Sequence, residues 1–190
     1  IVMHQVMTEN DSSWITTWTS RINSRQNLPD TTGFDLALNG AEVTSTHGAE
    51  DIGYIVIEKD LTNVFGTTNY ETRRSGDNLR GIGTCQNYGY INAYPTAPLA
   101  LTFQMAMDGG NGGWAASCLI SNGFHGMFID EDQVSNAERN HTTENAGFMM
   151  FDGPFAYSEV GTGGYETFGE LTSSAFNTGD DNTSYHVIDW

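Results

Sequence analysis

The sequence predicts an all-β protein made of two tandem antiparallel β-sandwich domains that are related by an internal repeat. Three observations predict it: the composition, a recurrence of residue types at an offset near 95, and short apolar segments separated by turn residues. The 190 residues include 22 Gly, 10 Phe and 8 Tyr, which favours short strands joined by tight turns. No segment has capped ends and 3.6-residue periodicity, so we expect no helix.

Matching residues recur along the chain in the same order. They are Gln5 and Gln104, Trp14 and Trp114, Gly33-Phe34 and Gly123-Phe124, His47 and His141, Glu50 and Glu144, Gly53-Tyr54 and Gly147-Phe148, and the Tyr-Glu-Thr triplets at 70–72 and 165–167. The offsets are 99, 100, 90, 94, 94, 94 and 95. Because the offset is nearly constant, we interpret the chain as two copies of one unit of about 95 residues, a usual size for a β-sandwich domain.

Each copy is expected to contain the same strands in the same order. An apolar strand comes first, then a polar corner, a strand that carries Trp14 or Trp114, a strand opened by Gly-Phe, an acidic loop and a last apolar strand. Alternation in the Gly-Phe strand predicts one buried and one wet face, and the last strand is a continuous apolar run typical of a sandwich centre. The first, Gly-Phe and last strands span 1–7, 34–38 and 52–57 in the first copy and 99–107, 124–129 and 146–151 in the second.

The two copies differ in what precedes them. A Tyr-rich stretch at 88–94 leads into the second copy and is expected to be its leading strand, whereas the first copy starts at Ile1. A candidate for the missing strand follows the second copy at the corresponding place, and it consists of Tyr185, His186, Val187, Ile188, Asp189 and Trp190. We therefore predict a first domain of residues 1–75 that is completed by strand 185–190, of its own or a neighbouring chain, and a second domain of residues 76–184.

The donated strand could complete the first domain in either of two forms of the protein. Insertion into the first domain of a neighbour gives an open head-to-tail polymer, because a heterologous contact that does not close generates a filament. Insertion into the first domain of its own chain gives a closed monomer. The serial order of the domains favours the polymer. The predicted function is therefore that of a structural subunit of an extracellular filament or surface layer, with other copies of itself as partners.

Charge and sequons indicate partners and location. Seven basic against 24 acidic residues give a net charge of −17, which disfavours nucleic acid and anionic membranes as partners. No apolar run reaches the roughly 18–20 residues that a membrane span needs, and the chain begins without a signal-like segment, as expected of a processed protein. Asn10, Asn140 and Asn182 open N-glycosylation sequons. Together these features predict a secreted or cell-surface protein.

In each copy, the order of the first strand, the Trp strand, the Gly-Phe strand, the His-x-x-Glu pair and the last apolar strand resembles the H-type lectin fold and related extracellular β-sandwich modules. In the second copy the likeness is carried by Gly112-Gly113-Trp114, 129–132, Glu138-Arg139 and 141–144, whereas the first copy has Leu38-Asn39-Gly40 in place of an acidic triplet. The resemblance implies a sandwich fold and an extracellular setting. It makes a secreted carbohydrate-binding lectin, with glycans as partners, the alternative function, although the glycan-contacting loop of the lectins is not present in recognisable form.

An acidic triplet is the best candidate metal site. Asp130, Glu131 and Asp132 supply the oxygen ligands that calcium prefers, with Asp108 and Glu138 as further candidates. The alternative is a solvated acidic loop in a protein that is acidic throughout. No organic cofactor is expected, because the sequence contains no cofactor fingerprint.

Two pairs of His and Glu recur in the repeat, His47 with Glu50 and His141 with Glu144. Because each pair stands just before a buried strand, we interpret both as structural hydrogen bonds that close a loop rather than as catalytic or zinc-binding pairs.

The two cysteines and the absence of catalytic motifs complete the prediction. Cys85 and Cys118 permit one disulfide if their strands are neighbours; the alternative is a pair of buried thiols. No nucleophile elbow or recognised Ser-His-Asp motif is present, so we expect no enzymatic activity. A secreted hydrolase with paired carboxylates is the weakest alternative.

Overall fold

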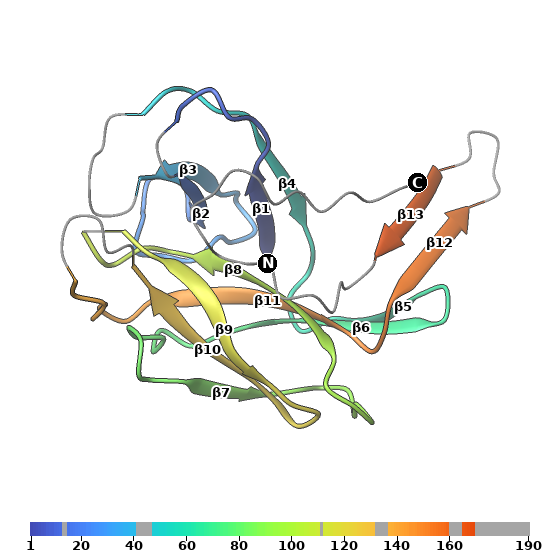
Figure 1. The fold of residues 1–190 in the computed structure, drawn as a ribbon. Coiled ribbons are helices and arrows are strands. Elements are labelled where there is room, and N and C mark those ends of the chain that lie inside the picture. The colour runs from blue at the N-terminus through green and yellow to red at the C-terminus, as the bar shows by residue number, and fades with distance from the viewer. Residues whose placement is uncertain (13–14, 41–46, 111, 132–136, 160–164, 170–190) are drawn as a thin grey trace.

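The structure, a computed structural model, is all-β, as the sequence predicts. It describes residues 1–12, 15–40, 47–110, 112–131, 137–159 and 165–169, with the backbone alone for 155–159 and 165–169, and these residues contain thirteen strands and no helix. Accordingly, no helix in the described ranges is long and apolar enough to cross a membrane. Several sheets lie against one another, as in a β-sandwich (Figure 1).

The largest sheet has six strands and combines both halves of the chain. Its order is β3 (Asp35–Asn39), β2 (Thr16–Ser20), β8 (Leu99–Met105), β11 (Asn145–Phe151), β6 (Thr68–Arg74) and β5 (Thr62–Phe65). All neighbours are antiparallel except β2 and β8, which meet in parallel through the single pair Thr19 and Met105. The two halves are therefore joined through a short parallel contact.

A three-stranded sheet covers part of the large one. Its order is β7 (Gln86–Gly89), β10 (Phe124–Asp130) and β9 (Trp114–Ile120), all antiparallel. The main core lies between this sheet and β11, where alternating side chains of β10 and β11 meet. The buried members are Leu79, Tyr94, Met127, Ile129, Ala146, Phe148 and Met150.

Strand β11 is buried on both faces. All seven of its residues are buried, and the side chains that point away from the main core, Met149 and Phe151, form a second cluster with Tyr70. The apolar run at 146–151 is thus the central strand that its sequence predicts.

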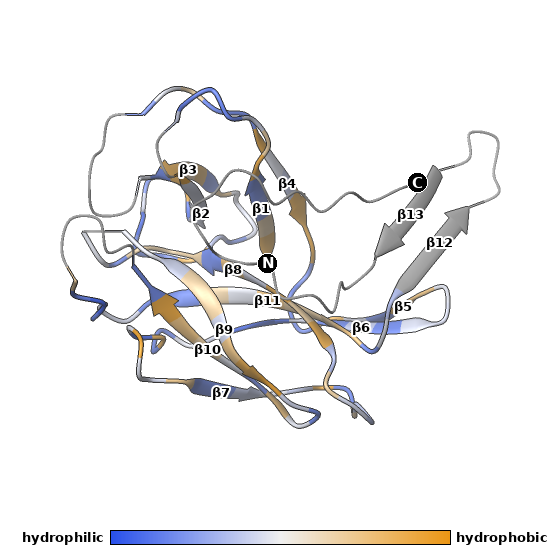
Figure 2. Ribbon diagram, viewed as in Figure 1, coloured by the Kyte–Doolittle hydropathy of each residue, from blue (hydrophilic) through white to orange (hydrophobic). Residues whose placement is uncertain are grey.

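The first half forms smaller sheets. β1 (Val2–Val6) pairs antiparallel with β4 (Ile52–Val56), with Met3 opposite Ile55, and both strands carry apolar residues (Figure 2). Within the described residues, β4 pairs with β1 alone. Strands β12 (Phe155–Glu159) and β13 (Tyr165–Gly169) form a separate antiparallel hairpin.

The predicted division into residues 1–75 and 76–184 stays a prediction. β6 ends at Arg74, before the predicted boundary, and yet it pairs with β11 of the second half. Residues 185–190, the predicted donated strand, lie outside the described residues.

Candidate functional site

In the part of the chain that the structure describes, no strand pairs with the outer edge of β4. Ile1 and Ile57 exchange both backbone hydrogen bonds, and the Met7 N–H donates to the Asp51 carbonyl. Because such pairs alternate along an antiparallel ladder, the N–H and C=O groups of Ile52, Tyr54 and Val56 point away from β1. On that side, no described strand is hydrogen-bonded to β4.

Apolar side chains are exposed beside this edge. Tyr54, Ile55 and Val56 are 57%, 58% and 58% exposed, and Met7 and Leu101 are exposed as well. The sequence of β4 is rich in β-branched and aromatic residues, which suits a pleated, buried strand. An apolar strand with a bare edge is a template for pairing with another strand.

A groove of about 450 Å³ runs along the β1–β4 sheet. Its lining residues come from β1 and the residue after it, β4 and β8, and are Met3, His4, Gln5, Met7, Gly53, Tyr54, Ile55, Leu101 and Phe103. A second groove of about 540 Å³ lies on the other side of β1, against β2, β8 and β9. A groove therefore borders β1 on each side.

His4 stands between the two grooves and is held by two hydrogen bonds. Its Nε2–H donates to the Gln104 carbonyl (2.9 Å), which leaves Nδ1 to accept from the Thr17 hydroxyl (2.7 Å). Burial lowers the pKa of His4, so the ring is neutral at pH 7. It fixes β1 to both β2 and β8.

Three glutamates each bind two successive backbone N–H groups. Asn10 and Asp11 donate to Glu50 (3.0 and 2.7 Å), Ile91 and Asn92 donate to Glu71 (2.9 and 2.6 Å), and Asp108 and Gly109 donate to Glu144 (2.8 and 2.7 Å). A hydrogen bond to an ionised carboxylate is roughly twice as strong as a neutral one. The N–H of Asn10 is the largest cause that lowers the pKa of Glu50, followed by the Thr8 hydroxyl. Each carboxylate closes a turn that follows a strand.

The predicted pair His141 and Glu144 belongs to a buried triad. His141 Nε2 lies 2.9 Å from Glu144 Oε1, and Nδ1 bonds Glu131 on the opposite side. All three side chains are inaccessible to solvent. Gly109 is required here because a Cβ at that position would overlap the imidazole of His141.

The pair His47 and Glu50 is arranged differently from its second-half counterpart. His47 Nδ1 lies 3.1 Å from the carbonyl of its neighbour Gly48, while Glu50 bonds Thr8 and the Asn10–Asp11 backbone. The carboxylate therefore closes the loop in both halves, and the imidazole contributes only in the second.

The candidate calcium ligands are largely engaged with protein partners. Arg139 forms an ion pair with Asp130, Glu131 bonds His141, and the Asn140 N–H donates to Glu138. Burial, followed by the charge of Glu144, raises the pKa of Asp108. Asp132 lies outside the described residues, and within them no group of three or more His, Cys, Asp or Glu is placed to hold a metal ion. Calcium binding stays a prediction.

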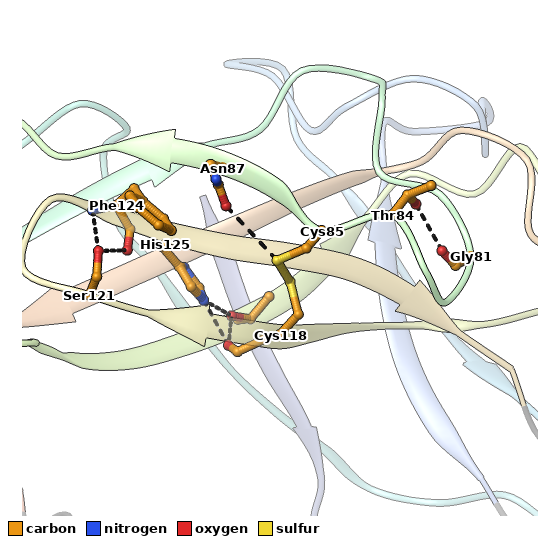
Figure 3. Close-up of a disulfide and its surroundings, with 10 residues drawn as sticks. Gly81, Thr84, Cys85, Asn87, Cys118, Ser121, Phe124 and His125 are labelled. Carbon is orange, nitrogen blue, oxygen red and sulfur yellow. Dashed lines mark hydrogen bonds between the residues drawn. A yellow bond between two sulfur atoms is a disulfide. The ribbon is translucent and has the colours of Figure 1, made fainter.

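Cys85 and Cys118 form a disulfide, with their Cα atoms 6.0 Å apart (Figure 3). Cys118 is the extra residue of a bulge in β9, because the register with β10 skips it between Leu119 and Ser117. The bridge crosses β10 at Gly126, where a Cβ would overlap the Cys85 sulfur. It ties the segment that leads into β7 to β9, across the strand between them.

A buried histidine on β10, His125, is not among the residues predicted from the sequence. His125 Nε2 lies 2.7 Å from the Ser117 hydroxyl and its ring packs edge-on against Phe148. Burial lowers the pKa of His125 to about 4. Spacing in the sequence gives no signal for this pair, because a bulge sets the register between β9 and β10.

The sequons differ in their surroundings. The Asn10 side chain is exposed and its amide donates to the Ala49 carbonyl (2.9 Å), Asn140 is exposed, and Asn182 lies outside the described residues.

No protein-family model, curated protein or solved structure matches the chain. The likeness to H-type lectins therefore stays an expectation from the sequence.

Proposed function

We propose that the protein is a structural, non-catalytic subunit of an extracellular filament or surface layer that assembles head-to-tail by donor-strand complementation. One observation carries the proposal. In the second half, the central strand β11 pairs with β6 along its outer edge and is covered on one face by tyrosines of the segment around β7, and both β6 and this segment precede β8 in the chain. In the corresponding strand of the first half, β4, no described strand is hydrogen-bonded to the outer edge.

Strand pairings support the correspondence between the halves. Gly53 lies opposite Gln5 on β1, and Gly147 lies opposite Phe103 on β8. The two strand pairs therefore share one register, with an offset of 94 residues between the glycines and 98 between the residues opposite them. The turns bound by Glu50 and Glu144 recur at the same offsets, since Asn10–Asp11 corresponds to Asp108–Gly109. On this basis β1 to β4 of the first half correspond to β8 to β11 of the second.

Corresponding side chains differ sharply in burial. Phe148 and Met150 are fully buried, whereas their counterparts Tyr54 and Val56 are 57% and 58% exposed. The difference supports the view that the first half lacks part of its core. In the second half the missing part is supplied by Tyr88, Tyr90 and Tyr94, which pack on Phe148 and its neighbours.

The C-terminal part of the chain has the features of a donor. The hairpin β12–β13 recurs about 95 residues after β5–β6, and both hairpins contain Tyr-Glu-Thr in their second strand. The segment 185–190 occupies the sequence position of the Tyr-rich lead-in to β8. We propose that 185–190 of one subunit fills the open first half of the next.

Two variants of β4 test the proposal, one with proline and one with threonine at Val56. Val56→Pro removes one outward N–H and leaves the hydrogen bonds of Ile55 and Ile57 to β1 in place, because proline is tolerated on a free strand edge. Val56→Thr keeps that N–H and serves as the control. Electron microscopy and light scattering are expected to find filaments for the natural protein and Val56→Thr, and single subunits with unchanged circular dichroism for Val56→Pro.

Three results would count against the proposal. A monomeric mass of the natural protein at all concentrations, with 165–190 protected from proteases, would indicate the closed form. Small oligomers retained on a sugar matrix would indicate a lectin. Filaments of Val56→Pro as abundant as those of the natural protein would show that assembly does not use the β4 edge.

A further inference from the structure

We infer that β13 of one subunit pairs antiparallel with the outer edge of β4 of the next, with Thr167 opposite Ile55. This inference rests on the proposed function and adds to it a second donated strand with a defined register. The partner is thus a second copy of this chain, and the contact is a continuous β-ladder beside the core contact of 185–190.

The register follows from the pairing of β6 with β11. In that pair Thr72 lies opposite Met149, with Glu71 opposite Met150 and Arg73 opposite Phe148. Met149 corresponds to Ile55 at the offset of 94, and Thr72 corresponds to Thr167 at the offset of 95. Transferring the pairing places Phe168 opposite Tyr54, Thr167 opposite Ile55 and Glu166 opposite Val56.

Hydrogen-bonding directions agree with this register. On β11, the Ser75 N–H donates to the Ala146 carbonyl and the Ala146 N–H donates to the Ser75 hydroxyl. Ala146, and by alternation Phe148 and Met150, therefore direct their backbone groups toward β6. Their counterparts Ile52, Tyr54 and Val56 are the residues whose groups point outward from β4. The donors and acceptors that β13 would meet are thus already in place.

Strand β13 has an edge available for this contact. Within the described residues it pairs only with β12. Its five residues, Tyr165–Gly169, match the five residues of β4. Two short strands of equal length, each paired on one side only, become inner strands when they join, which removes both exposed edges.

Cysteine pairs between two chains test the register. Ile55 and Thr167 would form a non-hydrogen-bonded pair, in which the Cα atoms lie about 4.5 Å apart, within the range that a disulfide spans. Purified Ile55→Cys and Thr167→Cys proteins are mixed under mild oxidation, and non-reducing electrophoresis with mass spectrometry quantifies the mixed dimer. The controls are Ile55→Cys mixed with Tyr165→Cys or with Gly169→Cys, each two residues out of register on the same face.

We expect the mixed dimer from the matched pair to exceed that from either control by about tenfold, because diagonal Cα atoms lie about 7–8 Å apart, beyond the reach of a disulfide. Preferential dimer from a control pair, with filaments still visible, would overturn the register and leave the proposed function standing. Absence of filaments and of all mixed dimers would overturn both. In the double variant Ile55→Cys/Thr167→Cys, a disulfide confined to single chains would also overturn the intermolecular contact.

Discussion

His141 donates toward Glu144 across 2.9 Å inside a site from which solvent is excluded, and it contacts Glu131 through its other ring nitrogen. An imidazolium at this position neutralises one of two buried carboxylates. The backbone N–H groups of Asp108 and Gly109 stabilise the other charge. The loop before β11 is therefore held by a charge arrangement that depends on one histidine.

Replacement of that histidine is expected to be strongly destabilising. His141→Gln removes the positive partner of two buried carboxylates, and breaking such a pair costs about 3–5 kcal/mol. Chemical denaturation followed by tryptophan fluorescence measures the loss. His47→Gln is the matched control, because the His47 ring is partly exposed and bonds the carbonyl of its neighbour Gly48 rather than a buried carboxylate, and a change within about 0.5 kcal/mol is expected. Equal effects of the two substitutions would contradict a special role for the triad.

The free energy of unfolding should also decrease as the pH rises above 6.5. Burial acts to lower the pKa of His141, but the hydrogen bonds with Glu144 and Glu131 outweigh it and raise the pKa above 6.5. A raised folded-state pKa contributes stability that is fully present below pH 6.5 and is lost as the pH rises through the folded-state value. Denaturation midpoints from pH 6 to 9 are expected to decline for the natural protein. The decline should be absent in His141→Gln.

His125 has the opposite dependence. Its pKa is lowered to about 4 by burial, so the unfolded chain binds a proton that the folded chain does not between about pH 6.5 and 4. Stability is complete above pH 6.5 and is lost as the pH falls, by at most about 2 kcal/mol between pH 7 and 5. His125→Gln should flatten this part of the profile, and a nuclear magnetic resonance titration of the imidazole checks the pKa directly. A His125 pKa near 6.5 would refute the explanation.

Gly126 is expected to be intolerant of any side chain. A Cβ at this position would overlap the Cys85 sulfur and approach Cys118, so Gly126→Ala either displaces the bridge or costs about 1–3 kcal/mol of overpacking. Thiol titration and thermal denaturation measure the two outcomes. Gly123→Ala provides the comparison, since nothing lies within 4 Å of a Cβ there. A fully oxidised Gly126→Ala protein of unchanged stability would show that β10 and the bridge are less closely packed.

Local patterns predicted much of the fold. The apolar runs at 99–107 and 146–151 correspond to β8 and β11, and the Gly-Phe strand at 124–129 corresponds to β10. These elements are predictable because alternation and apolar runs depend only on neighbouring residues.

Long-range partners could not be predicted in the same way. β6 buries polar residues, so its sequence pattern does not resemble that of a core strand. Glu71 is buried because it binds the Ile91 and Asn92 N–H groups. Thr72 is buried because its hydroxyl donates to the Glu58 carbonyl. The contact of Glu131 with His141 likewise joins two residues that no local pattern pairs, so the sequence could not predict it.

The bridge between Cys85 and Cys118 also sets how the protein responds to mechanical tension. Pulling applied along the chain passes through the sulfur atoms, so the intervening segment, spanning a sequence separation of 33, cannot extend. At about 3.3–3.6 Å per residue, roughly 110 Å of chain length between the two cysteines is not released when the second half unfolds. An oxidised molecule under load would therefore lengthen less than a reduced one, which limits the stretch of any fibre built from it.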